Sequence, residues 1–301
     1  MKASVIVCTR NRSALLGGSL DSLSRQGFPA GEFEVLVVDN ASTDGTAEVV
    51  ASWQATSSTR SRYLREDRIG LDHARNRGIA EAAGEIIVFL DDDARADPIW
   101  LETLLATFAD PSVSGAGGPV ELLWEGPRPW WLYPGFHKLL AAFDLGHEAC
   151  RVEKFPYLIG TNMGFTAETF RHFGGFHPDL DRRGRSLLSH GDTEFCHRVI
   201  QGGRIVRYEP RAIVRHVIPP DRQRFSFLIR RSYANGRSVC LYQRISGERT
   251  REDSTLRHVL WPLSTVPRCL GTGDWRATAQ ALANSAWHLG YLLEGRAGRS
   301  R

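Results

Sequence analysis

The sequence predicts an α/β domain with a mostly parallel sheet flanked by helices, followed by a helical C-terminal extension. Three observations support this prediction. With 301 residues, 42% of them hydrophobic, the chain can bury a sizeable core. In its first half, short β-branched and aliphatic runs alternate with segments of helical periodicity, as in strand–helix–strand units. From Phe225 onward the pattern is that of an amphipathic helix, which we expect to break at Pro262 and Pro267.

The elements of the first half have clear individual signals. Ser4–Cys8 is a β-branched run, typical of a strand buried on both faces. Ser13 is placed to cap the next helix, whose leucines recur at helical spacing and which ends near Gly27. The same reasoning predicts strands at 33–38, 61–66, 85–90, 115–119, 204–208 and 212–217, and helices at 46–53, 71–83 and 192–200.

Acidic residues follow two of the predicted strands directly. Asp39 comes after 33–38, and Asp91, Asp92 and Asp93 come after 85–90, the clearest strand of the sequence. Because ligands of such sheets gather beyond the carboxyl ends of the strands, we expect Asp39 and the triplet to lie near each other. Adjacent carboxylates repel unless a cation lies between them, which favours Mg²⁺ or Mn²⁺ together with a phosphate. The alternatives are a solvated turn for the triplet and a simple Asx-turn for Asp39.

Charge and cysteine content narrow the class of protein. The net charge is +4, but the residues from Phe225 to the end hold twelve Arg and five acidic residues, so the body is acidic and the tail basic. Five scattered cysteines without CxxC spacing favour a reducing cytosol over a disulfide scaffold. No apolar run reaches the roughly 20 residues of a membrane-spanning helix. The first residues lack the form of a signal peptide, so we expect a cytoplasmic protein.

Seven blocks of the sequence form an ordered set of motifs. They are SVIVCTRNR at 4–12, VLVVDNASTDGT at 35–46, ARNRG at 74–78 and VFLDDD at 88–93, followed by GTNM at 160–163, GGF at 174–176 and GDTEFCHR at 191–198. These blocks resemble those of family 2 glycosyltransferases. They occur in the family's order, and the resemblance covers roughly residues 3–220. The family consists of inverting, nucleotide-sugar-dependent enzymes with the GT-A fold. The resemblance therefore implies a GT-A catalytic domain at 1–220, with a nucleotide-binding half at 1–118 and an acceptor half at 119–220, and a basic helical extension at 221–301.

The resemblance implies roles on the donor side of the site. Thr9 and Arg12 would border the nucleotide, Asp39 would bind the base, and Arg75 would lie by the nucleotide or its phosphates.

The resemblance also assigns the acidic triplet to the donor. Asp91 would face the ribose, Asp92 would belong to the same nucleotide site, and Asp93 would hold the metal, Mg²⁺ or Mn²⁺, that bridges the diphosphate. His216 falls where some members have a further metal or phosphate contact, although a lone histidine is more often a packed or surface residue.

The catalytic base has two candidates. Asp192 matches the carboxylate that serves as general base in the family, although its place at a predicted helix start also suits an N-cap. Gly191 stands where the family usually has Glu, so Glu194 is the second candidate.

The aromatic and basic segments leave alternatives open. Trp124, Trp130, Trp131 and Tyr133 either form a lid or sugar-stacking platform or are buried against the sheet. The arginine-rich stretch 222–237 either lies on an anionic membrane surface, near a lipid-linked acceptor, or packs on the catalytic domain. Nucleic-acid binding fits poorly, because the excess of basic residues is confined to the tail and no recognition motif accompanies it.

Together these observations predict a metal-assisted, inverting glycosyltransferase of the hexosyltransferase type, cytoplasmic or peripheral at the inner face of the membrane. It would move a sugar from a nucleotide-diphosphate sugar to a saccharide, lipid-linked or small-molecule acceptor. One alternative is a sugar-1-phosphate nucleotidylyltransferase, but residues 8–12 lack the glycines of its phosphate loop. The other is a non-catalytic nucleotide-sugar-binding protein, which the glycine at position 191 permits.

Overall fold

The computed structural model describes residues 1–132, 134–180, 186–248 and 254–297, which form two compact units. The first unit comprises Met1–Leu123, Ala141–Pro178 and Gly191–Val217, and the second comprises Trp124–Leu140, Asp179–His190 and Ile218–Arg301. Neither unit is contiguous in sequence, because two segments interrupt the first unit and join the second. A functional division of the chain at residue 220 stays a prediction.

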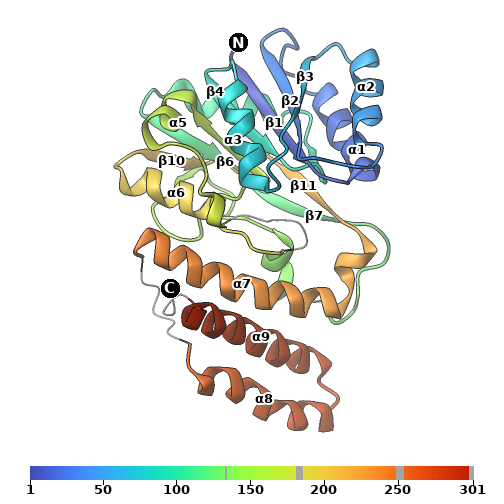
Figure 1. Cartoon of the computed structure of the whole chain (residues 1–301), viewed down its shortest axis with the longest axis vertical. Helices are drawn as coiled ribbons and strands as arrows, with labels where there is room; N and C mark the ends of the chain where they lie inside the picture. Colours follow the sequence, from blue (N-terminus) through green and yellow to red (C-terminus); the bar gives the residue numbers. More distant parts are fainter. Residues whose placement is uncertain (133, 181–185, 249–253, 298–301) are drawn as a thin grey trace. The chain divides into compact units, whose positions relative to one another are not determined.

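An eight-stranded sheet organises the first unit (Figure 1). Its strands are β1 (Ala3–Thr9), β2 (Phe33–Asp39), β3 (Arg60–Arg65), β4 (Ile86–Leu90), β6 (Val113–Gly117), β8 (Cys150–Arg151), β9 (Asn162–Thr166) and β10 (Ile205–Tyr208). Their order is β3-β2-β1-β4-β9-β6-β10-β8. The first four strands of this order are parallel, as expected. β9 runs antiparallel to both of its neighbours, a reversal that the sequence pattern does not predict.

Helices flank this sheet, and a second sheet accompanies it. The helices of the first unit are α1 (Ser13–Ser24), α2 (Thr46–Thr56), α3 (Leu71–Glu81), α4 (Trp100–Ala106), α5 (Ala167–Phe173) and α6 (Gly191–Gln201). The smaller sheet has three strands in the order β5-β11-β7, formed by β5 (Ala94–Ala96), β11 (Val214–Ile218) and β7 (Val120–Trp124). Short 3₁₀ helices lie at Thr107–Ala109, Pro134–Leu140, Pro178–Leu180 and Pro220–Gln223.

Alternating side chains bury the central strands on both faces. Val5 and Val35 point into one apolar cluster with leucines of α1, while Ile6 and Leu36 point into the opposite cluster with Phe89. All seven residues of β2 are buried. Because each fully buried aliphatic side chain stabilises the fold by about 1.5–3 kcal/mol, the two clusters fix the register of the strands and the position of the residues that follow them.

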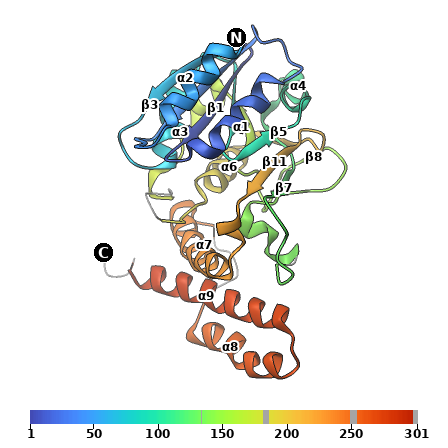
Figure 2. The same cartoon turned by 90° about the vertical axis from the view of Figure 1, so that its right-hand side faces the viewer.

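Three long helices dominate the second unit: α7 (Phe225–Ser246), α8 (Leu256–Gly271) and α9 (Trp275–Ala297). Figures 1 and 2 show α9 lying between α7 and α8. α7 and α9 approach each other at glycines. A Cβ atom added at Gly236 would lie 1.9 Å from the carbonyl oxygen of Trp287, and one at Gly290 would lie 2.0 Å from that of Tyr233. The two helices therefore touch backbone to backbone.

The expected helix breaks at Pro262 and Pro267 are wrong, because both prolines lie inside α8. Each proline removes one backbone donor and frees the carbonyl four residues earlier. Val259 is the only buried residue of α8, so water can reach those carbonyls and the helix continues. The first interruption after Phe225 comes instead at Gly247, whose φ of 71° terminates α7. Within the described residues, no helix combines the length and apolar character needed to cross a membrane.

Candidate active site

The predicted donor residues lie where parallel strands end side by side. Thr9 and Asp39 are the last residues of β1 and β2, and they are paired in register. The acidic triplet follows β4, which is parallel to β1 on its other side. Arg12, at the start of α1, reaches from the end of β1 to Asp92 and Asp93. The edge therefore brings together residues 80 positions apart in the sequence.

Asp92 and Asp93 are buried and paired with the guanidinium of Arg12, which excludes the solvated-turn alternative for these two residues. Arg12 donates through Nη1 to Asp92 Oδ1 at 2.7 Å and through Nη2 to Asp93 Oδ2 at 2.5 Å. His216 in β11 places its Nε2 atom 3.1 Å from the same Asp93 oxygen. Asp91 differs, because 31% of its side chain is exposed. The triplet thus has one accessible carboxylate and two interior ones.

Burial and charge oppose each other in this cluster. Burial, opposed by the attraction of Arg12 and aided by the neighbouring Asp93 carboxylate, raises the pKa of Asp92 to about 6. Burial lowers the pKa of Arg12, but Asp92 and Asp93 raise it more, so the guanidinium stays charged. The cluster therefore sets two buried carboxylates against one partly exposed guanidinium, and a second cation or an anionic ligand would redistribute these charges.

The fit of this cluster to a divalent ion rests on Asp93 and His216. They offer a carboxylate oxygen and an imidazole nitrogen 3.1 Å apart. Among the described residues, no group of three or more His, Cys, Asp or Glu could hold a metal ion by itself. Mg²⁺ and Mn²⁺ bound with a substrate are typically held by one or two carboxylates and completed by phosphate oxygens, so Asp93 is the main ligand and the imidazole nitrogen of His216 the secondary one. The residues therefore fit an ion that binds together with a diphosphate.

Asp39 closes a turn of its own chain that is one residue longer than the Asx-turn expected as its simpler interpretation, because its side chain bonds the amide three residues on. Its Oδ1 accepts a hydrogen bond from the Ser42 amide at 2.8 Å, and its Oδ2 accepts one from the Tyr63 hydroxyl at 2.5 Å. Burial and the Asp39 carboxylate raise the pKa of Tyr63 to about 12. Asp39 is only 2% exposed, so the turn and the Tyr63 hydroxyl hold its carboxylate in one orientation.

Asn40 organises the same edge, although the sequence analysis did not single it out. Its amide nitrogen donates to the carbonyls of Glu66 and Arg68 at 3.0 and 2.8 Å, and its amide oxygen accepts from the Gly70 N–H at 2.7 Å. These bonds fix the loop that leads into α3. An asparagine directly after a buried strand, four positions before a second turn-forming aspartate, is the signal that could have found it.

Arg75 links the acidic triplet to α3. It is 6% exposed, and its Nη1 atom lies 3.2 Å from Asp72 Oδ1 while its Nη2 atom lies 3.8 Å from Asp91 Oδ1. The guanidinium also lies over the ring of Phe176, 5.3 Å from its centroid. Burial lowers the pKa of Arg75, but Asp72, Asp91 and Asp192 raise it more. Asp72 is thus a member of the site that the sequence analysis missed.

The two candidate bases have different surroundings. Asp192, in the first turn of α6, accepts the Gly160 N–H at 2.7 Å. Glu194 is 6% exposed, and its two oxygens each accept a hydrogen bond of 2.8 Å from Arg198. Arg198 also donates to the carbonyl of Gly175, so the Glu194–Arg198 pair binds the turn that follows α5. Asp192 therefore belongs to the Arg75 cluster, and Glu194 belongs to a packing contact.

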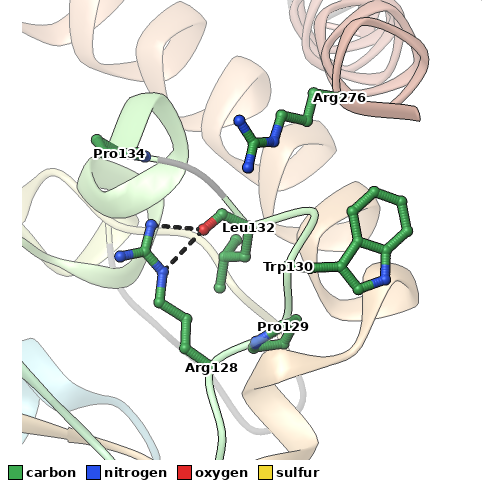
Figure 3. A pocket seen from close by; sticks show the side chains of 6 residues that line it. All are labelled: Arg128, Pro129, Trp130, Leu132, Pro134 and Arg276. Atoms are coloured by element: carbon green, nitrogen blue, oxygen red, sulfur yellow. Dashed lines mark hydrogen bonds between the residues drawn. The ribbon is translucent and has the colours of Figure 1, made fainter. Parts of the chain in front are cut away.

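The aromatic segment lies in the second unit, apart from Tyr133, which is outside the described residues. Arg128 donates twice to the carbonyl of Leu132, at 3.0 and 2.7 Å, and its guanidinium lies 5.6 Å from the ring centroid of Trp124. The segment borders a pocket of about 310 Å³. Figure 3 shows the side chains that line it. Residues Arg128, Pro129, Trp130, Leu132, Pro134 and Arg276 line this pocket. The lid function of these aromatics stays a prediction.

Comparisons with known proteins agree with this geometry. The family described as "Glycosyl transferase family 2" matches residues 4–174, more than half of the chain. A glucosyl-dolichyl phosphate glucuronosyltransferase of Haloferax volcanii is 26% identical over 245 residues, covering 79% of this chain and 76% of that protein. A validoxylamine A glucosyltransferase of Streptomyces hygroscopicus subsp. jinggangensis is 32% identical over 173 residues, covering 56% of this chain and 39% of that protein.

Solved structures show the same fold. The mannosyltransferase PcManGT from Pyrobaculum calidifontis, in complex with GDP-Man and Mn²⁺, superposes with a TM-score of 0.62 at 24% identity, covering 99% of this chain and 75% of that chain. S. aureus TarS in complex with UDP gives a TM-score of 0.57 at 19% identity, covering 100% of this chain and 92% of that chain. With a central sheet whose carboxyl edge carries the acidic triplet, and with a family match over most of that sheet, the chain belongs to glycosyl transferase family 2 and is a glycosyltransferase with the GT-A fold.

Proposed function

We propose that this glycosyltransferase moves a sugar from a nucleotide-diphosphate sugar to an acceptor hydroxyl, with inversion and with the help of Mg²⁺ or Mn²⁺. The observation that carries the proposal is the cluster at the carboxyl edge of the sheet. There, the partly exposed guanidinium of Arg12 and the buried guanidinium of Arg75 lie among the carboxylates of Asp91, Asp92 and Asp93. Such a cluster has both the cations that bind phosphates and the carboxylates that bind a metal.

On the donor side, each residue has a task that its surroundings support. The carboxylate of Asp39, oriented by the Tyr63 hydroxyl and the Ser42 amide, binds the nucleobase, and the accessible Asp91 binds the ribose. Thr9, 3% exposed beside Asp39, borders the nucleotide. Arg75 stabilises the negative charge that the leaving diphosphate gains.

The ion would be held by Asp93 and His216, with Asp92 and Arg12 adjusting the local charge. When bound, the ion supplies a Lewis acid beside the diphosphate. His216 counts as a ligand here because its imidazole already lies against Asp93 at the buried end of the cluster.

On the acceptor side, Asp192 is the general base that takes the proton of the attacking hydroxyl. Glu194 is the weaker candidate, because both of its oxygens are paired with the charged guanidinium of Arg198, whereas the oxygens of Asp192 accept the backbone N–H groups of Gly160 and Thr193. The Gly160 N–H holds one oxygen of Asp192 and fixes the carboxylate in place. Attack on the face opposite the leaving diphosphate inverts the anomeric centre, and general-base catalysis of this kind contributes about 10² to 10⁴ in rate.

The similar proteins leave the donor and the acceptor open. By name they include an enzyme that acts on a dolichyl-phosphate-linked sugar and one that acts on validoxylamine A, and the solved structures hold GDP-Man or UDP. We therefore propose a saccharide, lipid-linked or small-molecule acceptor. A thermal-shift screen of nucleoside diphosphates and their sugars, with and without Mn²⁺, identifies the donor, because stabilisation rises with ligand excess over Kd.

Three variants test the assignment once a donor is known. Asp192→Asn should keep donor binding and lower turnover at least a hundredfold, at the low end of general-base effects. Asp93→Ala should lose transfer and the Mn²⁺-dependent part of the thermal shift. Glu194→Gln should change stability more than turnover. Near-parental transfer by Asp93→Ala, or a large turnover loss confined to Glu194→Gln, contradicts these roles.

The same assays separate the two alternatives. Release of pyrophosphate from a nucleoside triphosphate identifies a nucleotidylyltransferase. Donor binding without hydrolysis or transfer to any acceptor identifies a non-catalytic sensor, and either result overturns the proposal.

We further propose peripheral membrane contact through α8. Two arginines of the stretch 222–237 that lie in α7 have partners within the second unit. Arg231 donates to the carbonyl of Leu187, and Arg237 pairs with Glu294 at 2.7 Å. α8 instead contains no acidic residue and has arginines at 257 and 268. Its exposed apolar side chains are Leu256, Leu260, Trp261, Leu263 and Leu270. An apolar face beside arginines suits an anionic lipid surface.

Co-sedimentation with vesicles tests this contact. The chain should bind vesicles of phosphatidylcholine and phosphatidylglycerol in equal parts, and the Trp261→Ser variant should bind less. Phe155→Ser is the matched control, because Phe155 is 62% exposed, close to the 64% of Trp261, but lies in the first unit. Equal binding of both variants, or equal binding to vesicles of phosphatidylcholine alone, overturns the proposal.

A further inference from the structure

Asp72 lies in a position that only a glycine at residue 191 allows. Asp72 is 2% exposed in the first turn of α3. A Cβ atom added at Gly191 would lie 2.1 Å from Asp72 Oδ2 and 2.9 Å from its Cγ atom. A side chain at residue 191 and the carboxylate of Asp72 therefore cannot occupy this space together.

The partner of Asp72 is packed just as closely. Asp72 Oδ1 lies 3.2 Å from Arg75 Nη1, and a Cβ atom added at Gly160 would lie 2.1 Å from Arg75 Nη2. The N–H of this same Gly160 donates to Asp192 Oδ2 at 2.7 Å. Two glycines thus make room for an ion pair that lies against the backbone holding the proposed base.

Arg75 also has Asp91 as a neighbour, 3.8 Å from its Nη2 atom. The side chain of Asp72 is 3% exposed and that of Asp91 is 31% exposed, so Asp72, the buried carboxylate, is the stronger partner of Arg75. With Asp72 removed, nothing described in α3 would hold the guanidinium back from Asp91, the carboxylate that the proposed function assigns to the donor. The direction in which Arg75 points therefore depends on Asp72.

We propose that Asp72 is a positioning residue of the transfer reaction, and that a carboxylate reaching the same space from residue 191 can replace it. This inference rests on the proposed function. Asp72 holds Arg75 against Gly160, and thereby keeps Arg75 aimed at the diphosphate and Asp192 at the acceptor. The carboxylate has to reach this space, and it can do so from α3 or from α6.

An exchange of positions tests the inference. Asp72→Ala should lower kcat on the order of a hundredfold, as misplacement of reacting groups by about 1 Å does, while the donor KM changes less. The double variant Asp72→Ala/Gly191→Glu should recover at least about tenfold of that loss. Gly191→Glu alone should be inactive, because its side chain meets Asp72.

A neutral counterpart separates charge from volume. Asp72→Ala/Gly191→Gln fills the same space without a charge and should not recover activity. Recovery by Gln equal to that by Glu would reduce Asp72 to a packing residue and overturn the inference. An unchanged kcat in Asp72→Ala would overturn it as well.

Two further measurements keep the result interpretable. Asp72→Asn, nearly identical in shape, serves if Asp72→Ala does not fold, and it should also lower kcat. The Asp192→Asn variant, measured in parallel, separates a failure of the proposed function from a failure of the role given to Asp72. If Asp192→Asn loses turnover while both Asp72 variants keep it, the proposed function stands and the positioning role of Asp72 is wrong.

Discussion

Replacing Gly236 with alanine should destabilise the second unit, although alanine is the better helix former. In an exposed helix interior, Gly→Ala stabilises by up to about 1 kcal/mol. At Gly236 the added methyl carbon would lie 1.9 Å from the carbonyl oxygen of Trp287, and backbone cannot rotate away as a side chain can. Overpacking of this kind costs about 3 kcal/mol, the upper part of the usual range. The net expectation is a loss of about 2 kcal/mol.

Gly295 is the matched control on the same helix pair. A Cβ atom there would lie 3.7 Å from Cys240 Sγ, an ordinary van der Waals contact, so Gly295→Ala should stabilise by up to about 1 kcal/mol. Urea unfolding of both full-length variants, followed by far-UV circular dichroism, measures the difference, which we expect to be about 3 kcal/mol. If Gly236→Ala proves as stable as Gly295→Ala, the backbone contact between α7 and α9 is not what holds these helices together.

Three smaller predictions concern the first unit. Hydrogen bonds from Arg68 lower the pKa of Glu66 from 4.5 to about 2, so Glu66→Gln should cost about 1 kcal/mol at neutral pH, allowing for the exposure of the arginine. This gap should narrow as the pH falls from 4.5 toward 2, and urea unfolding at several pH values checks it. Asn76→Ala removes two hydrogen bonds to the turn after α5 and should cost about 1–2 kcal/mol in the same assay. Burial raises the pKa of the Cys8 thiol, so iodoacetamide should modify the exposed Cys150 first, as peptide mass mapping would show; faster labelling of Cys8 would refute this.

Much of the donor half follows from local signals. β4 is a continuous apolar run and β2 is apolar from 35 to 38, and parallel pairing then brings Asp39 and the triplet to one edge without further information. The reversal of β9 has no such signal, because its residues are buried on both faces whichever way it runs. The same holds for α8, where solvent exposure decides that two prolines do not end the helix.

The candidate site shows a similar division. Arg12, Arg75 and Asp192 could be named from motifs, but their partners could not. Asp72 is recognisable only because its carboxylate fills the space above Gly191, a contact across more than a hundred residues of sequence. Such pairs cannot be found from local sequence, because nothing in α6 indicates that its glycine leaves space for a carboxylate and nothing in α3 indicates that Asp72 fills that space.

The antiparallel course of β9 lets a different kind of chain segment reach the reaction centre. Leu90, the end of β4, pairs with Asn162, the beginning of β9, so the residues just before β9 arrive at the edge that other strands reach only as they leave the sheet. Thr161 bonds Asp91 from there, and Gly160 bonds Asp192. Loop exits from parallel strands and a loop entry into a reversed one thus converge from opposite directions of the chain. Under the proposed function, the outgoing loops recognise the donor, so descendants of such an enzyme could exchange the incoming loop, and with it their choice of acceptor, without losing that donor.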